Sequence, residues 1–170
     1  MRSHSFPTRR SSDLFQYRYA CDGVTLGAPT TDASGTCTFD DGPSTHTVLS
    51  RIVDKDGGFA DRTTIVDVLN VAPTARFVTP ANPTDEGSSF SLALADATDA
   101  SQADVAAGLI LEYDCSLGAG YQSGDTCTAR ENPSQPVKAR ITDKDGGSTE
   151  YTTTVPVGNI APSVTITAPP

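Results

Sequence analysis

An internal repeat constrains this 170-residue chain more than any other feature of its sequence. The pentapeptide DKDGG at 54–58 recurs at 143–147, and the tetrapeptide NVAP at 70–73 recurs as NIAP at 159–162. Both motifs recur at the same offset of 89 residues. A fixed period of this length indicates domains of one kind arranged in tandem, each folding as a separate unit.

The offset predicts one complete repeat at 71–159. Residues 15–70, which come before it, match only the second half of a repeat, and residues 160–170 match the opening of a third. We therefore expect a partial domain, then a complete domain, then the start of another.

The first residues of the chain do not belong to this pattern. The stretch HSFPTRRSSDL at 4–14 resembles translated sequencing adapter. We therefore expect 1–14 to be a non-native artefact and exclude it from reasoning about the fold.

The complete repeat consists mostly of short strand-like stretches. Five of them have alternating or β-branched sequences, at 74–78, 89–94, 109–113, 136–142 and 150–157. Phe90, Leu92 and Leu94 alternate with small or polar residues, which places them on one face of a strand. Only 102–107 has the composition of a helical turn. Strands at this spacing predict an antiparallel sandwich of two sheets.

Three features of the sequence are the DxDGG motif of the hairpin, the NxAP motif at the junction and the acidic loop DATD at 96–99. Together they resemble the PKD domain, an immunoglobulin-like β-sandwich found in tandem on secreted and surface proteins. The resemblance covers nearly everything from Phe15 onward. It implies an all-β fold of tandem immunoglobulin-like antiparallel β-sandwiches, of which the first is truncated.

The four cysteines follow the repeat. Cys21 and Cys115 occupy equivalent places, as do Cys37 and Cys127, so the repeat selects the pairs Cys21–Cys37 and Cys115–Cys127 from three possible pairings. Each bond would stabilise its domain by about 3 kcal/mol in the chain-entropy model. A zinc site is not indicated, because no two cysteines stand in a close CxxC pair. Disulfides imply an oxidising location outside the cytoplasm.

This interpretation predicts the thiol content of the native protein. A thiol reagent should find no free cysteine before reduction and all four after denaturation and reduction. Four reactive thiols in the native protein would contradict it.

Acidic residues concentrate where an immunoglobulin-like sandwich would bring loops together. The hairpin loop, the acidic loop and the entering linker lie at the same end of such a domain, which would gather Asn70, Asp96, Asp99, Asp143 and Asp145. Converging oxygen ligands are what Ca²⁺ prefers, so these residues form a candidate Ca²⁺ site, and solvated turn residues are the competing interpretation. The spacing excludes an EF-hand, because glycine stands where that loop needs its third ligand.

A second, weaker candidate site lies at the opposite end of the domain. Asp85 and Glu86 precede a predicted strand and could meet Asn159 at the next junction. Asp54 and Asp56 are equivalent to the hairpin aspartates of the complete repeat but lack its linker and acidic loop. Any metal bound by them should therefore be held less tightly.

Composition excludes several classes of function. The net charge is -9 with few, scattered cationic residues, which argues against nucleic acid as a partner. No apolar run is long enough to span a bilayer. None of the GxSxG, HExxH or GxxxxGK motifs occurs, and turn aspartates on a small sandwich enclose no substrate, so we expect no enzyme.

The sequence therefore predicts an extracellular, secreted or cell-surface segment that acts as a non-catalytic spacer or adhesion module. Its expected partners are neighbouring repeats of its own chain and, for an adhesion role, a polysaccharide or a surface protein. The alternative is a carbohydrate- or protein-binding accessory module of a secreted hydrolase, for which exposed aromatics would be needed. Only Tyr113, Tyr121 and Tyr151 are candidates for that role.

Overall fold

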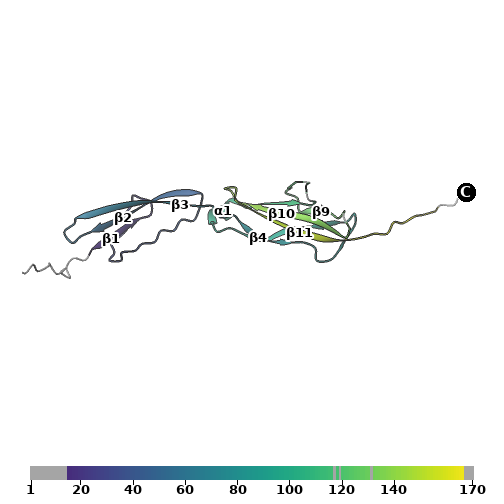
Figure 1. Ribbon diagram of the computed structural model, residues 1–170, viewed down its shortest axis with the longest axis horizontal. Coiled ribbons are helices and arrows are strands. Elements are labelled where there is room, and N and C mark those ends of the chain that lie inside the picture. The colour runs from purple at the N-terminus through teal and green to yellow at the C-terminus, as the bar shows by residue number, and fades with distance from the viewer. Residues whose placement is uncertain (1–14, 117, 119, 131, 167–170) are drawn as a thin grey trace, which may run out of the picture. The chain divides into compact units, whose positions relative to one another are not determined.

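The computed structural model describes residues 15–116, 118, 120–130 and 132–166. The chain forms two compact units, unit 1 from Met1 to Leu69 and unit 2 from Asn70 to Pro170 (Figure 1). The stretch interpreted as adapter-derived, 1–14, lies outside the described residues. Among the described residues, no helix is long and apolar enough to cross a membrane.

Unit 1 is built on one antiparallel sheet. Its strands are β1 (Gln16–Ala20), β2 (Ser44–Val53) and β3 (Phe59–Val68), in the order β1-β2-β3. The DKDGG turn joins β2 to β3, and the disulfide Cys21–Cys37 closes the long segment between β1 and β2. Of the hydrophobic side chains described in this unit, only that of Ala20 is fully buried.

Unit 2 contains a larger sheet that forms one layer of a sandwich. The strand order is β5 (Thr84–Asp85), β11 (Ser148–Gly158), β10 (Ser134–Thr142) and β8 (Ile110–Asp114). The hairpin β10–β11 at its centre is antiparallel and joined by the second DKDGG turn. Alternate residues of β10 are buried, because one side of the sheet faces the core.

The second layer of unit 2 consists of two strand pairs. They are β4 (Thr74–Val78) with β7 (Ala93–Thr98), and β6 (Ser89–Ser91) with β9 (Thr126–Thr128). A short helix, α1 (Gln102–Ala107), connects β7 to the first layer and confirms the predicted helical turn. The described part of the chain is thus all-β apart from this turn, and unit 2 is an immunoglobulin-like β-sandwich.

The core of unit 2 lies between these layers. The three alternating residues Phe90, Leu92 and Leu94 are buried in it, as the sequence predicted. Two tyrosine hydroxyls also join the layers: Tyr113 Oη accepts a hydrogen bond from the Leu94 amide at 3.1 Å, and Tyr151 Oη accepts one from the Ala75 amide at 2.8 Å. Both tyrosines therefore contribute to packing.

The predicted strand 89–94 is divided in the structure. Leu92 lies between β6 and β7, and its amide donates to the Asp125 carbonyl at 2.9 Å, continuing the β6–β9 ladder. After Leu92 the chain pairs with β4 instead. One alternating apolar stretch thus serves two strand pairs. The sequence did not predict the short strands β5 and β9, because two or three residues carry no periodic signal.

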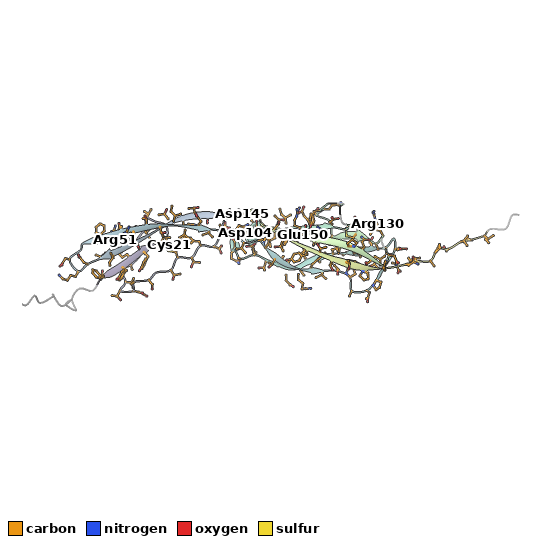
Figure 2. All side chains as sticks on the ribbon, viewed as in Figure 1. Cys21, Arg51, Asp104, Arg130, Asp145 and Glu150 are labelled. Atoms are coloured by element: carbon orange, nitrogen blue, oxygen red, sulfur yellow. A yellow bond between two sulfur atoms is a disulfide. The ribbon has the colours of Figure 1, made fainter. Side chains whose placement is uncertain are left out.

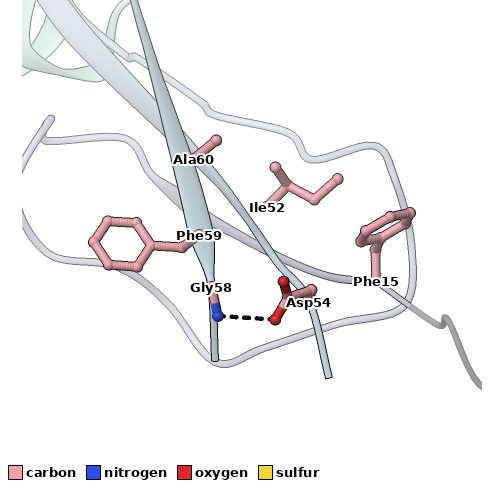
Figure 3. Close-up of a pocket in the computed structure, with 6 residues that line it drawn as sticks. All are labelled: Phe15, Ile52, Asp54, Gly58, Phe59 and Ala60. Atoms are coloured by element: carbon pink, nitrogen blue, oxygen red, sulfur yellow. Dashed lines mark hydrogen bonds between the residues drawn. The ribbon is translucent and has the colours of Figure 1, made fainter. Parts of the chain in front are cut away.

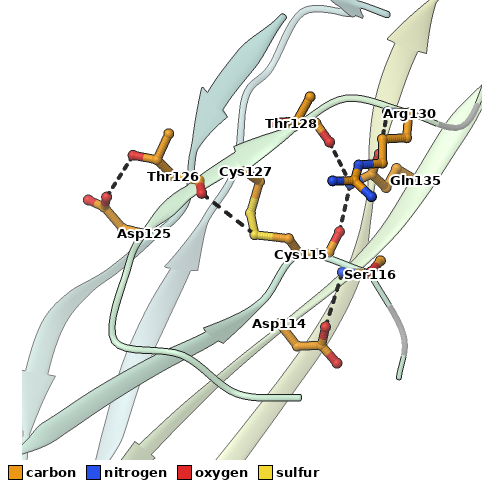
Figure 4. Close-up of a disulfide and its surroundings, with 9 residues drawn as sticks. All are labelled: Asp114, Cys115, Ser116, Asp125, Thr126, Cys127, Thr128, Arg130 and Gln135. Atoms are coloured by element: carbon orange, nitrogen blue, oxygen red, sulfur yellow. Dashed lines mark hydrogen bonds between the residues drawn. A yellow bond between two sulfur atoms is a disulfide. The ribbon is translucent and has the colours of Figure 1, made fainter. Parts of the chain in front are cut away.

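The disulfide Cys115–Cys127 joins the two layers of unit 2, because Cys115 follows β8 and Cys127 lies in β9 (Figure 4). Beside it, the amide of Gln135 is fully buried. Its Nε2 donates to the carbonyls of Cys115 and Thr128 at 2.6 and 3.2 Å, and its Oε1 accepts from the Arg130 amide at 2.7 Å. One side chain thus satisfies three backbone groups.

We predict that Gln135→Leu destabilises unit 2 although the two side chains are similar in size. The substitution leaves buried backbone groups without partners, which costs about 1–3 kcal/mol. Urea unfolding measures the loss, and Ser134→Ala at the exposed neighbouring position is the control. A loss no larger than that of the control would show that water replaces these hydrogen bonds.

Candidate metal centre

Asp143 organises the turn between β10 and β11. Its Oδ1 accepts hydrogen bonds from the backbone amides of Asp145 and Gly147, at 2.9 and 2.8 Å. Gly146 has a φ of +87°, a conformation that favours glycine. In unit 1 Asp54 makes the same two bonds, to the amides of Asp56 and Gly58. The repeated sequence therefore folds into the same turn twice.

The second oxygen of Asp143 is bound by the first residue of unit 2. Asn70 Nδ2 donates to Asp143 Oδ2 at 2.8 Å, and Thr149 Oγ1 donates to the Pro73 carbonyl at 2.6 Å. A Cβ on Gly147 would collide with Asn70 Nδ2 and Asp143 Oδ2, so this position admits only glycine without displacing one of them. The NVAP segment is thereby fixed to the hairpin turn.

These contacts change the acidity of Asp143. Burial raises its pKa, but the hydrogen bonds from Asn70 and from the backbone amides of Gly147, Asp145 and Gly146 together outweigh burial and leave the pKa below its ordinary value. The carboxylate is therefore the stable form in the folded protein.

Two further aspartates reach the same place through a helix cap. Ser101 caps α1: its Oγ accepts from the Asp104 amide at 3.2 Å, while its own amide donates to Asp99 Oδ1 at 2.8 Å. This arrangement places Asp104 on the first turn of α1 and Asp99 just before the helix (Figure 2 labels Asp104).

Asp99, Asp104 and Asp143 form a cluster of buried carboxylates. Their exposed fractions are 8%, 0% and 2%, and one oxygen from each lies within 4.8 Å of the others. Asp99 Oδ2 and both carboxylate oxygens of Asp104 have no hydrogen-bond partner among the described residues. Lys144 Nζ approaches Asp104 Oδ1 to 3.3 Å as an ion pair. Within the described ranges, Asp99 Oδ2 and Asp104 Oδ2 therefore remain buried without a partner.

Such an arrangement is costly unless positive charge enters it. Three carboxylates at this spacing repel one another, and Lys144 supplies only one positive charge. The cluster offers only oxygen ligands, which suit Ca²⁺ better than zinc or copper. The residues present therefore fit a divalent, oxygen-preferring cation.

The structure brings together three of the five residues predicted for this end of the domain. Asn70, Asp99 and Asp143 lie together, with Asn70 bound to the Asp143 carboxylate. Asp96 is exposed, has a φ of 56° and forms an ion pair with Arg76 at 2.9 Å. Asp145 pairs with Lys144 and has a carboxylate oxygen within 4.8 Å of one of Asp104, but it does not belong to the group that Asp104 forms with Asp99 and Asp143.

The residues considered for the opposite end are more loosely arranged. Asp85 lies opposite Gly158 in the short parallel β5–β11 ladder, and the Glu86 amide donates to the Gly158 carbonyl at 3.0 Å. Asn159 is exposed. Among the described residues, Asp85 and Glu86 join no group of three metal-ligating side chains.

The sequence reasoning missed Asp104. The signal was present, because Ser101 is followed three positions later by an acidic residue, the spacing of a helix N-cap. That pattern would have placed Asp104 on the first helical turn. Its burial against the hairpin could not be read from the sequence.

No family model matches the chain, and no curated protein is similar to it in sequence. Among solved structures, the chain is similar to fibronectin(III)-like modules of CbhA from Clostridium thermocellum, with a TM-score of 0.40 and 13% identity over 90% of this chain and 83% of that one. It is also similar to the protocadherin GammaB4 extracellular domain, with a TM-score of 0.38 and 17% identity over 85% of this chain and 26% of that one. A third similarity, to the Treponema pallidum lipoprotein Tp47, has a TM-score of 0.25.

The lowered pKa of Asp143 predicts how acid acts on unit 2. The stability that this carboxylate contributes is complete above the ordinary Asp value of 3.8 and is lost as the pH falls through the lower folded value. With a chelator present, we expect the melting temperature of the Asn70→Ala variant to fall less than that of the unmodified protein when the pH is lowered from about 6 to about 3. The reason is that the hydrogen bond from Asn70 is the strongest of the contacts that lower the pKa of Asp143.

The control is Asn82→Ala, at an exposed asparagine far along the chain from this turn. Its acid sensitivity should equal that of the unmodified protein. Equal acid sensitivity in all three proteins would contradict the assigned role of Asn70.

Proposed function

We propose that this chain is a non-catalytic extracellular segment, a spacer or adhesion module of PKD-like repeats in a secreted or surface protein, with Ca²⁺ held by the carboxylate cluster of unit 2. One observation carries the proposal: Asp99 Oδ2 and Asp104 Oδ2 are buried carboxylate oxygens that have no hydrogen-bond partner among the described residues. A cation between them would supply the missing interactions.

The location outside the cytoplasm is supported by the two disulfides, Cys21–Cys37 and Cys115–Cys127. The described cysteines are all paired. Bonds of this kind form and persist in oxidising compartments and are rare in the cytosol.

A structural role is supported by where the acidic residues lie. The clustered aspartates are at most 8% exposed, so a substrate could not reach them for acid–base chemistry. Ca²⁺ bound there would instead fix α1, the hairpin turn and, through Asn70, the entering chain to one another. A spacer made of such domains gains rigidity where the chain enters the domain.

The alternative of a carbohydrate-binding module finds less support among the tyrosines. Tyr113 and Tyr151 contribute to the core, as described above. Tyr121 lies on the outer side of the large sheet, where the Arg140 guanidinium covers its ring at 4.2 Å and its hydroxyl donates to Glu150. The hydroxyl and one side of the ring are therefore already engaged.

The test is thermal unfolding with and without Ca²⁺. A ligand at about 100 times its dissociation constant stabilises the folded state by about 2.7 kcal/mol, so we expect millimolar Ca²⁺ to raise the melting temperature of unit 2. Asp104→Asn should abolish that rise. Without Ca²⁺, the same variant should be at least as stable as the unmodified protein, because it removes a repelling charge.

Asp96→Asn is the matched control, because Asp96 is acidic and nearby in sequence but exposed. Its response to Ca²⁺ should be unchanged. The absence of any Ca²⁺ effect on the unmodified protein, or an undiminished effect in Asp104→Asn, would reject the proposed site.

A further inference from the structure

Lys144 brings a positive charge against the carboxylate cluster of unit 2. It lies in the turn between β10 and β11, immediately after Asp143. Its Nζ lies 3.3 Å from Asp104 Oδ1, and it also pairs with the carboxylate of Asp145 (Figure 2 labels both aspartates). The side chain of Lys144 is 32% exposed, whereas that of Asp104 is 0% exposed. One ammonium group thus reaches from the surface of the domain to a buried carboxylate.

Unit 1 contains the same turn without such a contact to a buried carboxylate. Asp54 accepts a hydrogen bond from the Gly58 amide at 2.8 Å, beside apolar side chains (Figure 3). Lys55, the equivalent of Lys144, pairs with Asp56 at 2.7 Å, and these two side chains are 50% and 75% exposed. Among the described residues, neither aspartate belongs to a group of three metal-ligating side chains. The contact of the lysine with a buried acid is therefore particular to unit 2.

The ammonium group of Lys144 and a bound cation would compete for the same carboxylate. A divalent cation on Asp104 would lie only a few ångströms from an ammonium group that contacts Oδ1 of that residue. Like charges at such a separation repel strongly where water is excluded. Asp145 offers the lysine a second carboxylate that is itself 23% exposed. Lys144 can therefore leave Asp104 and keep a partner at the surface.

We propose that Lys144 is a tethered competitor for the Ca²⁺ site of unit 2. Its ammonium group neutralises part of the cluster when no metal is bound, and it must withdraw from Asp104 when Ca²⁺ binds. The inference rests on the proposed function, because it concerns the same carboxylates. Extracellular modules bind Ca²⁺ with dissociation constants of about 10⁻⁴–10⁻³ M, and the competing lysine places this site in that weak range.

The test is calorimetric titration of the full, metal-free chain with Ca²⁺. Lys144→Met removes the charge and keeps an unbranched side chain at this partly exposed position. We expect its dissociation constant for Ca²⁺ to be lower than that of the unmodified protein by at least about tenfold, a factor that corresponds to about 1.4 kcal/mol of removed repulsion. Lys144→Arg retains the charge and should leave the dissociation constant close to that of the unmodified protein.

The repeat supplies the matched control. Lys55→Met removes the same charge from the equivalent turn of unit 1, so the affinity for Ca²⁺ should not change. The melting temperature without metal is the second readout. There Lys144→Met should lower the melting temperature more than Lys55→Met does, because only Lys144 is a counter-charge for a buried carboxylate.

The outcomes separate this inference from the proposed function. Equal Ca²⁺ affinity of the unmodified protein and Lys144→Met, or equal tightening by Lys55→Met, would overturn the competition and leave the Ca²⁺ site in place. Binding by Lys144→Met alone would support the competition and reject a Ca²⁺ site in the unmodified protein. Absence of binding by both proteins would reject the site and the competition together.

Discussion

The buried carboxylate of Asp143 is the interaction around which one end of unit 2 is organised. One of its oxygens holds the turn between β10 and β11, and the other holds Asn70 at the entry of the chain. Gly147 is required because the two groups leave no room for a side chain. In unit 2 the motifs NVAP and DKDGG are thus two sides of one contact.

The buried carboxylate of Asp143 has two further aspartates close to it. Asp99 and Asp104 approach Asp143 from the loop before α1 and from α1 itself, and in the described part of the chain some of their carboxylate oxygens have no hydrogen-bond partner. Buried charges of one sign are stable only when a counter-charge joins them. A divalent cation would account for all three positions at once, and it would connect the fold of this end to the proposed role of the domain as a rigid spacer.

The sequence predicted the parts of the fold that carry a periodic or repeated signal. The strands at 74–78 and 109–113, the helical turn and the pairing of the four cysteines all followed from alternation or from the repeat. The sequence did not predict that the strand 89–94 is divided at Leu92, because apolar and polar residues alternate in the same way whether the stretch forms one strand or two. It missed Asp104, because burial of a polar residue depends on tertiary packing that no local pattern records.

The central claim is that a cation completes the cluster of Asp99, Asp104 and Asp143. The most direct measurement is a crystal structure of the full chain grown with Ca²⁺, with the anomalous signal used to locate the ion. The account predicts one ion, with Asp99 Oδ2 and Asp104 Oδ2 among its ligands at about 2.3–2.6 Å. Carboxyl groups joined directly by hydrogen bonds, with no anomalous peak between them, would contradict it.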